Sequence, residues 1–211
     1  MSGTTYRTVA RSGLAEIEVK RSRFVGRVAR VATESDARAY VESIRKRHWD
    51  ARHHCSAFVL GPDAAVQRSS DDGEPSGTAG APMLEVLRGR DLSDVVAVVA
   101  RYFGGVLLGA GGLVRAYSDT VRVAVEEAGV LERRLLATFE VTVGHAEAGR
   151  LDSELRARGV QVLGAAYAEQ AVLRVAVPEE DSPRLGEVVA ELSGGTADVR
   201  ATGTLWVDRL S

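Results

Sequence analysis

The chain has 211 residues, of which 45% are hydrophobic and 27% charged, and its formal net charge is −2. These values are typical of a globular protein of one or two domains, and they lack the strong basic excess of a dedicated nucleic-acid-binding protein. No apolar run approaches the roughly 20 residues that span a bilayer, and the first residues lack the apolar segment of a signal peptide. Cys55 is the one cysteine, so an internal disulfide is excluded and a cytoplasmic location without membrane contact is expected.

The periodicity of residues 1–133 predicts an alternation of short strands and helices. The expected strands cover 15–20, 22–31, 53–60, 65–70 and 94–103, and the expected helices cover 33–48, 81–89 and 113–129. Thr33 with Asp36 resembles a capping box at the start of the first helix, and Pro82 suits the first turn of the second. The valine-rich strand 94–103 is apolar through its first part, which indicates burial on both faces.

After Arg133 the pattern restarts. The expected strands cover 135–144, 160–169, 170–178 and 196–210, and the expected helices cover 145–159 and 179–195. This βαββαβ order is that of the ferredoxin-like split unit. We therefore predict an α+β protein of two domains, residues 1–133 and 134–211.

The charges are distributed unevenly between these two parts. Residues 1–134 contain 20 Arg and Lys against 17 Asp and Glu, whereas residues 135–211 contain 7 against 12. The acidity of the second part argues against its being the main contact for a polyanion.

A first glycine-rich loop, SSDDGEPSGTAGAP, precedes the second expected helix. Its carboxylates, Asp71, Asp72 and Glu74, repel one another unless a positive group lies nearby. They could hold Mg²⁺, contact another ligand, pair with Arg101 or Arg115, or lie in a solvated turn. The small side chains that follow, including Ser76 and Thr78, suit close backbone contact with a ligand or with another part of the protein.

A second glycine-rich loop, FGGVLLGAGGLVR, joins the buried strand to the third expected helix. Its glycines are Gly104, Gly105, Gly109, Gly111 and Gly112. A strand, a glycine loop and a helix N-terminus together favour anion binding, to which Arg101 and Arg115 could contribute; tight packing is the structural alternative. The spacing fits neither the P-loop nor the dinucleotide-binding pattern, and Val106-Leu107-Leu108 would either be buried or form an apolar tip.

Basic and aromatic residues suggest a surface for RNA. The candidate contacts are Arg21, Arg23, Arg27, Arg47, Trp49, Arg52 and His53. Solvated charged faces are the alternative. His53 and Cys55 share a face of their strand, but two ligands do not complete a zinc site, and neither a metal nor a cofactor is predicted.

The stretches SDDGEPSGTAGAPMLEVL and VVARYFGGVLLGAGGLVRAY strongly resemble the YigZ/IMPACT family, as do KRSRFVG and IRKRHWDARHHCSA. The resemblance covers about residues 15–128, and residues 135–211 look like the second domain of bacterial members. It implies an N-terminal domain similar to the second domain of a small-subunit ribosomal protein and to domain IV of elongation factor G. It also implies a ferredoxin-like C-terminal domain similar to domain V of that factor.

The family has no assigned catalytic activity, and its eukaryotic members act in translational control. The resemblance therefore implies a non-catalytic, translation-linked protein whose N-terminal domain contacts RNA, the ribosome or a translation-associated protein. Two other hypotheses remain open: a protein-interaction platform that binds no nucleic acid, and a Mg²⁺-dependent enzyme acting on a phosphate-containing small molecule at the two glycine-rich loops.

Overall fold

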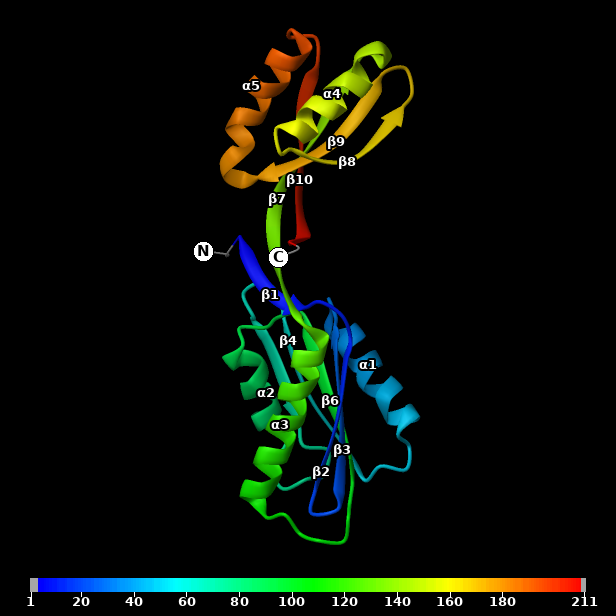
Figure 1. Cartoon of the computed structure of the whole chain (residues 1–211), viewed down its shortest axis with the longest axis vertical. Coiled ribbons are helices and arrows are strands. Elements are labelled where there is room, and N and C mark those ends of the chain that lie inside the picture. Colours follow the sequence, from blue (N-terminus) through cyan, green and yellow to red (C-terminus); the bar gives the residue numbers. More distant parts are fainter. Residues whose placement is uncertain (1–3, 210–211) are drawn as a thin grey trace. The chain divides into compact units, whose positions relative to one another are not determined.

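The computed structural model describes residues 4–209 (Figure 1). The chain divides after Arg133 into two compact units, and the second unit comprises Arg134–Asp208. None of the helices in the described part is long and apolar enough to cross a membrane.

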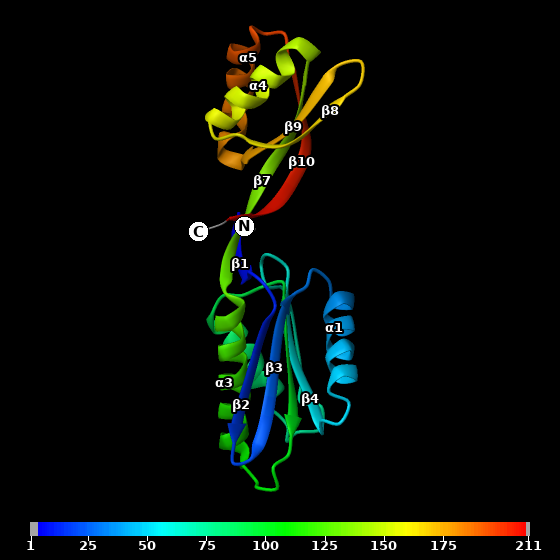
Figure 2. The ribbon, with the colours of Figure 1, turned by 45° about the vertical axis from the view of Figure 1, so that its right-hand side comes forward.

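The first unit is built on a five-stranded antiparallel sheet in the order β2-β3-β6-β4-β5. The strands of this sheet are β2 (Gly13–Val19), β3 (Ser22–Arg30), β4 (His53–Leu60), β5 (Val66–Ser70) and β6 (Val95–Tyr102). The unit also contains β1 (Thr5–Val9), which lies outside this sheet, and the helices α1 (Glu34–Arg47), α2 (Gly80–Gly89) and α3 (Ala110–Ala128). Helices α2 and α3 cover one face of the sheet, and α1 covers part of the other (Figure 2).

The central strand β6 is enclosed by these helices. Every residue from 95 to 100 is fully buried, which confirms the prediction of burial on both faces. One side of β6 contributes to a core beneath α2 and α3, where the rings of Phe24 and Tyr117 meet edge to face at 5.2 Å. The other side packs on α1 through a smaller cluster that includes Ile44.

Helix α1 starts where the capping pattern predicts, because Thr33 Oγ1 accepts a hydrogen bond from the backbone N–H of Asp36 at 3.1 Å. Helix α3 starts three residues earlier than expected, at Ala110, since two glycines hide the helical pattern of its first turn. Arg115 therefore lies in the second turn, whereas a helix beginning at residue 113 would have placed it in the first.

Strand β1 is absent from the sequence-based expectations. The backbone N–H of Ser93 donates to the carbonyl of Arg7 at 2.9 Å, and the hydroxyl of Tyr6 donates to Asp94. These partners lie more than 80 residues away in sequence, so no local pattern indicates the strand.

The second unit has the βαββαβ order that the sequence predicts. Its elements are β7 (Val130–Val143), which begins before the unit boundary, α4 (His145–Ala157), β8 (Gln161–Tyr167), β9 (Ala171–Pro178), a short 3-10 turn η1 (Glu179–Asp181), α5 (Ser182–Ser193) and β10 (Asp198–Arg209). Strand β9 lies between β7 and β8, and β10 pairs with β7. Leu151, Leu155, Leu173 and Val189 are central to its core. The last helix begins at Ser182 and not at 179, because η1 occupies those residues.

Candidate functional site

Both glycine-rich loops lie at one end of the first sheet, the lower end of this unit in Figure 1. The antiparallel register pairs Arg23 with Tyr102 and His53 with Arg101, so β6 ends where β3 and β4 begin. Residues 71–79 lead from β5 into α2, and residues 103–109 lead from β6 into α3. The fold therefore brings the two loops to the same place.

Asp71 closes the first loop onto the start of α2. Its carboxylate accepts hydrogen bonds from the backbone N–H groups of Gly77, Ala79 and Gly80, at 2.8 to 3.0 Å. Burial acts to raise the pKa of Asp71, but these three hydrogen bonds outweigh it, and the pKa lies below its ordinary value. The carboxylate supplies the cap that Ala79, the residue before the helix, does not provide.

Asp72 joins the same loop to β4 and α1. Its carboxylate accepts from the backbone N–H of His54 at 2.6 Å and from the Arg45 guanidinium at 3.0 Å. The Nδ1–H of His53 donates to the Asp72 backbone carbonyl at 2.8 Å. Arg45, which the sequence analysis did not single out, is thus the positive group that compensates Asp72.

Glu74 lies at the centre of a buried polar network. One of its oxygens accepts from the Arg101 guanidinium at 2.6 Å and from the Tyr117 hydroxyl at 2.8 Å. The Glu74 and Arg101 side chains are only 3% and 7% exposed. Of the pairings considered from the sequence, the one between Glu74 and Arg101 is present. Arg101 is therefore a buried structural cation, although its Nε has no hydrogen-bond partner among the described residues.

The second loop joins this network at Gly104. Arg101 reaches the Ser22 hydroxyl at 3.5 Å, and Ser22 Oγ accepts from the Gly104 backbone N–H at 3.2 Å. A Cβ atom at Gly104 would lie 2.0 Å from the Arg21 carbonyl carbon, so this position requires glycine. No sequence motif indicates Ser22 or Tyr117 as a site residue. From the sequence, Tyr117 is one apolar position of an amphipathic helix.

Cys55 lies beneath the network. Its thiol is in contact with the Tyr117 hydroxyl at 3.3 Å and donates to the Asp71 carbonyl at 3.0 Å. Burial raises the pKa of Cys55 to about 12, against a smaller lowering by the hydrogen bond with Tyr117. Burial likewise raises the pKa of Tyr117. Both groups stay protonated at neutral pH, so this thiol is a core side chain and not an activated nucleophile.

The three acidic side chains of the first loop are thus engaged by different parts of the fold. Asp71 binds the start of α2, Asp72 binds α1 and β4, and Glu74 binds β6 and α3. Within residues 4–209, no three His, Cys, Asp or Glu side chains are grouped so that they could hold a metal ion. The carboxylates needed by the Mg²⁺ hypothesis are therefore not arranged around a common point.

The remaining residues of the two loops differ in burial and in the space around them. Thr78 is buried and donates to the Pro75 carbonyl at 2.6 Å, whereas Ser76 is exposed. Gly105 and Gly109 have φ angles of +82° and +74°. Added Cβ atoms at Gly105, Gly109 and Gly111 would meet nothing within 4 Å, and one at Gly112 would meet only the Leu108 side chain, at 3.0 Å.

A cavity of about 390 Å³ opens between the two loops. Its wall combines the polar residues Arg52, His53 and Glu74 with the apolar residues Phe103 and Leu107. Of the candidate loop residues, Glu74, Arg101 and Gly109 line this cavity, and Arg115 does not. The cavity is concave, mostly apolar and supplied with a few polar groups, which is the usual character of a ligand site.

Exposed basic side chains surround this end of the sheet. The residues that we call the basic rim are Lys20, Arg21, Lys46, Arg47, Arg52 and Arg115. In the described chain, no member of the basic rim forms an ion pair, and the neighbouring side chains of Trp49 and Leu107 are each 81% exposed. Positive charge and exposed apolar surface therefore occur together here.

The other basic candidates are less free. Arg23 stacks over the Tyr102 ring at 4.2 Å and lies 3.6 Å from Glu16. Arg27 is half-buried on the same face of β3, as the alternation predicts, and its Nε is buried without a partner among the described residues. Within the basic rim itself, Arg52 lies 5.9 Å from the centre of the Phe103 ring.

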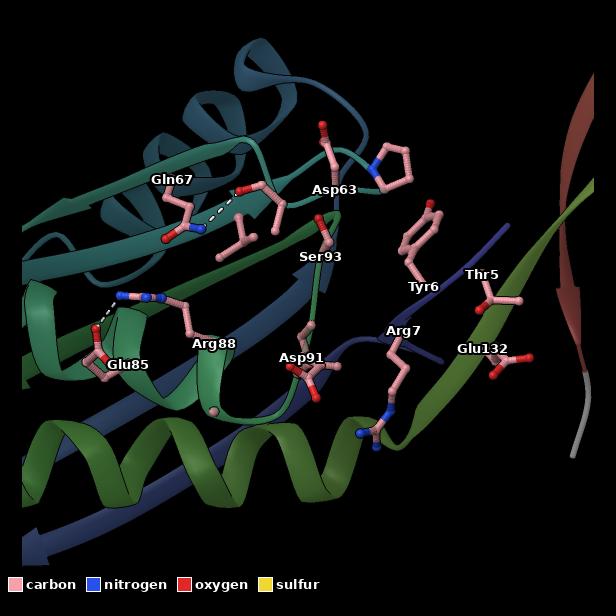
Figure 3. A pocket seen from close by; sticks show the side chains of 15 residues that line it. Thr5, Tyr6, Arg7, Asp63, Gln67, Glu85, Arg88, Asp91, Ser93 and Glu132 are labelled. Atoms are coloured by element: carbon pink, nitrogen blue, oxygen red, sulfur yellow. Dashed lines mark hydrogen bonds and ion pairs between the residues drawn. The ribbon is translucent and has the colours of Figure 1, made fainter. Parts of the chain in front are cut away.

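A larger cavity of about 730 Å³ lies at the opposite end of the first unit (Figure 3). Its wall mixes basic Arg7 and Arg88 with acidic Asp63, Asp91 and Glu132 (Figure 3). Arg88 is turned to Glu85 at 2.8 Å. Since its charges are exposed and of both signs, this cavity defines no particular ligand, and the cavity between the glycine-rich loops is the stronger candidate.

The fold and site define a two-domain α+β protein whose N-terminal domain joins two glycine-rich loops through a buried Glu–Arg–Tyr network. Residues 20–125 match the Impact N-terminal domain, and residues 141–196 match a domain of unknown function, DUF1949. The chain belongs to the IMPACT/YigZ family and has the two-domain organisation of its bacterial members.

Individual relatives match over nearly the whole chain. IMPACT family member YvyE of Bacillus subtilis is 41% identical over 93% of this chain and 90% of its own length. IMPACT family member YigZ of Escherichia coli is 38% identical, with 87% and 91% covered. A solved structure titled as that of a hypothetical protein is 34% identical, with a TM-score of 0.65 over 95% of this chain and 98% of its own.

Proposed function

We propose that this protein is a non-catalytic, translation-linked regulator that contacts RNA or the ribosome through the basic rim of its N-terminal domain. The observation that carries the proposal is the basic rim: six exposed cations around one end of the sheet, none of which forms an ion pair within residues 4–209, beside the exposed Trp49. Phosphates attract unpaired cations, and unstacked bases stack on exposed aromatic rings, so the combination suits single-stranded or irregular RNA.

The translation link rests on the family. In this proposal the N-terminal domain is of the kind found in a small-subunit ribosomal protein and in domain IV of elongation factor G, and the C-terminal domain is ferredoxin-like. In this proposal the protein works in the cytoplasm, on components of the translation machinery. The acidic balance of residues 135–211 favours the N-terminal domain as the RNA contact.

A binding role also agrees with how the polar loop residues are used. Asp71, Asp72 and Glu74 are occupied in joining the loops to the domain, and the Cys55 thiol is buried and protonated. No described nucleophile is placed beside a general base in this cavity, so we assign no reaction to it.

The test is fluorescence anisotropy with labelled RNA (tRNA and ribosomal RNA hairpins) over a range of salt concentrations. We expect the affinity to fall steeply with salt, and the combined change Arg47→Glu and Arg52→Glu to weaken binding about tenfold or more and to lower the salt slope by about one per lost phosphate contact. The matched control is Arg7→Glu, because Arg7 is an exposed arginine at the opposite end of the same domain. Salt-independent binding, or an equal effect of the control, would refute the proposal.

The second candidate is a protein-interaction platform, which the exposed apolar side chains of Trp49 and Leu107 favour. A pull-down from native lysate separates the two. Nuclease treatment should release the bound material if RNA carries the contact, and should leave it in place if a protein does.

A further inference from the structure

The cavity between the glycine-rich loops has a buried carboxylate in its wall. The Glu74 side chain is 3% exposed, and both of its hydrogen bonds, from Arg101 and Tyr117, end on the same oxygen, Oε1. The other oxygen, Oε2, has no hydrogen-bond partner among residues 4–209. Oε2 is not one of the fully buried side-chain atoms that lack a partner, so it keeps some contact with solvent and is free to accept a hydrogen bond from a ligand in the cavity.

His53 supplies a second acceptor to the same cavity. Its Nδ1–H donates to the Asp72 carbonyl, so the proton is on Nδ1 and the Nε2 lone pair is available. Within the described chain, Nε2 has no hydrogen-bond partner. The wall thus offers two acceptors, Glu74 Oε2 and His53 Nε2, and two donors, the Arg52 guanidinium and the unpartnered Nε–H of Arg101.

The rest of the wall suits a flat, apolar face. Phe103 is 42% exposed and lines the cavity beside Leu108 and Leu113. The volume of about 390 Å³ lies within the roughly 300 to 1,000 Å³ typical of small-ligand pockets. A planar heterocycle with N–H donors on its edge matches both the shape and the polarity of this site.

Leu107 gives this site a connection to nucleic acid. It lies at the tip of the second loop, is 81% exposed, and lines the cavity next to Arg52 of the basic rim. Apolar side chains on such tips insert between bases and unstack them, and the unstacked base then needs a place to go. The cavity lies beside that tip.

Resting on the RNA-binding function proposed above, we propose that this cavity is a nucleobase pocket. It receives one unpaired base of the bound RNA, stacked on Phe103 and displaced by Leu107. The base bears an exocyclic amino group, which donates to Glu74 Oε2. Uracil fits less well, because its single N–H lies between two carbonyl oxygens that the carboxylate repels.

The experiment compares the intact protein's affinity for three RNA hairpins of the same stem. One carries a single bulged 2-aminopurine, one a bulged uridine, and one no bulge. We expect the 2-aminopurine hairpin to bind about tenfold more tightly than the bulge-free hairpin, which is within the effect of stacking one base. The uridine hairpin should bind more weakly than the 2-aminopurine hairpin, and 2-aminopurine fluorescence should change on binding. The ratio of affinities should vary little with salt, because the phosphates contacted are the same.

Two surface variants test the pocket itself. Ala110→Phe fills the cavity from its exposed rim and Leu107→Ala removes the wedge, so each should abolish most of the bulge preference without changing the affinity for the bulge-free hairpin. Leu14→Ala, at an exposed leucine outside the cavity, is the control and should leave the preference intact.

The outcomes separate the two proposals. Equal affinity for bulged and bulge-free hairpins, with salt-dependent binding retained, overturns the nucleobase pocket and leaves the RNA-binding function standing. Variants that weaken all three hairpins equally also overturn the pocket. If no hairpin binds at any salt concentration, both proposals fall.

Discussion

At the scale of single residues, Glu74 and Arg101 are the clearest example of a charged pair with a structural role. Both side chains are buried, and Tyr117 shares the acceptor oxygen of Glu74. In the sequence they appear as a loop acid and a basic residue at a strand end, which is why both were candidates for ligand contact. Both charges have lost their contact with water, so each is stabilised mainly by the other. Removing one would leave the other as an uncompensated buried charge, which is strongly unfavourable.

We therefore predict that Arg101→Met lowers the free energy of unfolding by about 3 to 5 kcal/mol, because it leaves the Glu74 carboxylate buried without its counter-charge. Adding Glu74→Leu to Arg101→Met should recover a large part of that loss, since the double variant has no buried charge. Urea denaturation measures both changes. As a control, Arg38→Met breaks the exposed pair with Glu34 and should cost less than about 1 kcal/mol. A similar cost for the buried and exposed pairs would contradict this account.

At the scale of elements, the features that sequence predicts well are those set by neighbouring residues. The buried valine strand β6, the Thr33 cap of α1 and the strand and helix order of the second unit all follow from local periodicity or capping chemistry. Strand β1 depends on contacts near Asp94, 88 positions from Tyr6. The site network joins Glu74 to partners 27 and 43 positions away. No local rule specifies such distant pairings, so the sequence locates the two loops and offers the Glu74–Arg101 pair only as one alternative, and it does not indicate Tyr117 as a partner.

The glycines of the second glycine-rich loop differ in the space around them, so we predict different effects on stability when they are replaced by alanine. Gly104→Ala should destabilise the protein by about 1 to 3 kcal/mol, because the new Cβ would lie 2.0 Å from the Arg21 backbone and the loop would have to shift. Gly111→Ala is the matched control: it lies in the first turn of α3 with open space around it, so the change should raise stability by about 0.5 to 1 kcal/mol. Thermal unfolding measures both, and equal effects would show that the tight contact at Gly104 is unimportant.

At the scale of the whole molecule, the two units differ in net charge and in which charged side chains they present on their surfaces. The basic rim belongs entirely to the first unit, whereas many acids of the second are on its surface, among them Glu180 and Glu191, which pair with Arg134 and Arg158. Like charge repels, so an acidic domain on the same chain opposes the approach of RNA and restricts it to the basic end of the other domain. In the proposed RNA-binding function, the acidic C-terminal domain would lower non-specific binding to nucleic acid. The small net charge of the whole chain hides this difference between the two domains.

This arrangement predicts that a fragment of residues 1–133 binds RNA at least as tightly as the whole chain. The gain should be several-fold at about 0.05 M salt and should shrink towards nothing at about 0.3 M, because the Debye length falls below about 10 Å above 0.1 M. The cut leaves only the first residues of β7, so circular dichroism should first confirm that the fragment retains its folded structure. Charge reversal at Arg47 and Arg52 should weaken the fragment and the whole chain by the same factor. If the fragment instead loses affinity at both salt concentrations while remaining folded, the C-terminal domain contacts RNA directly, and the assignment of the RNA surface to the basic rim alone is wrong.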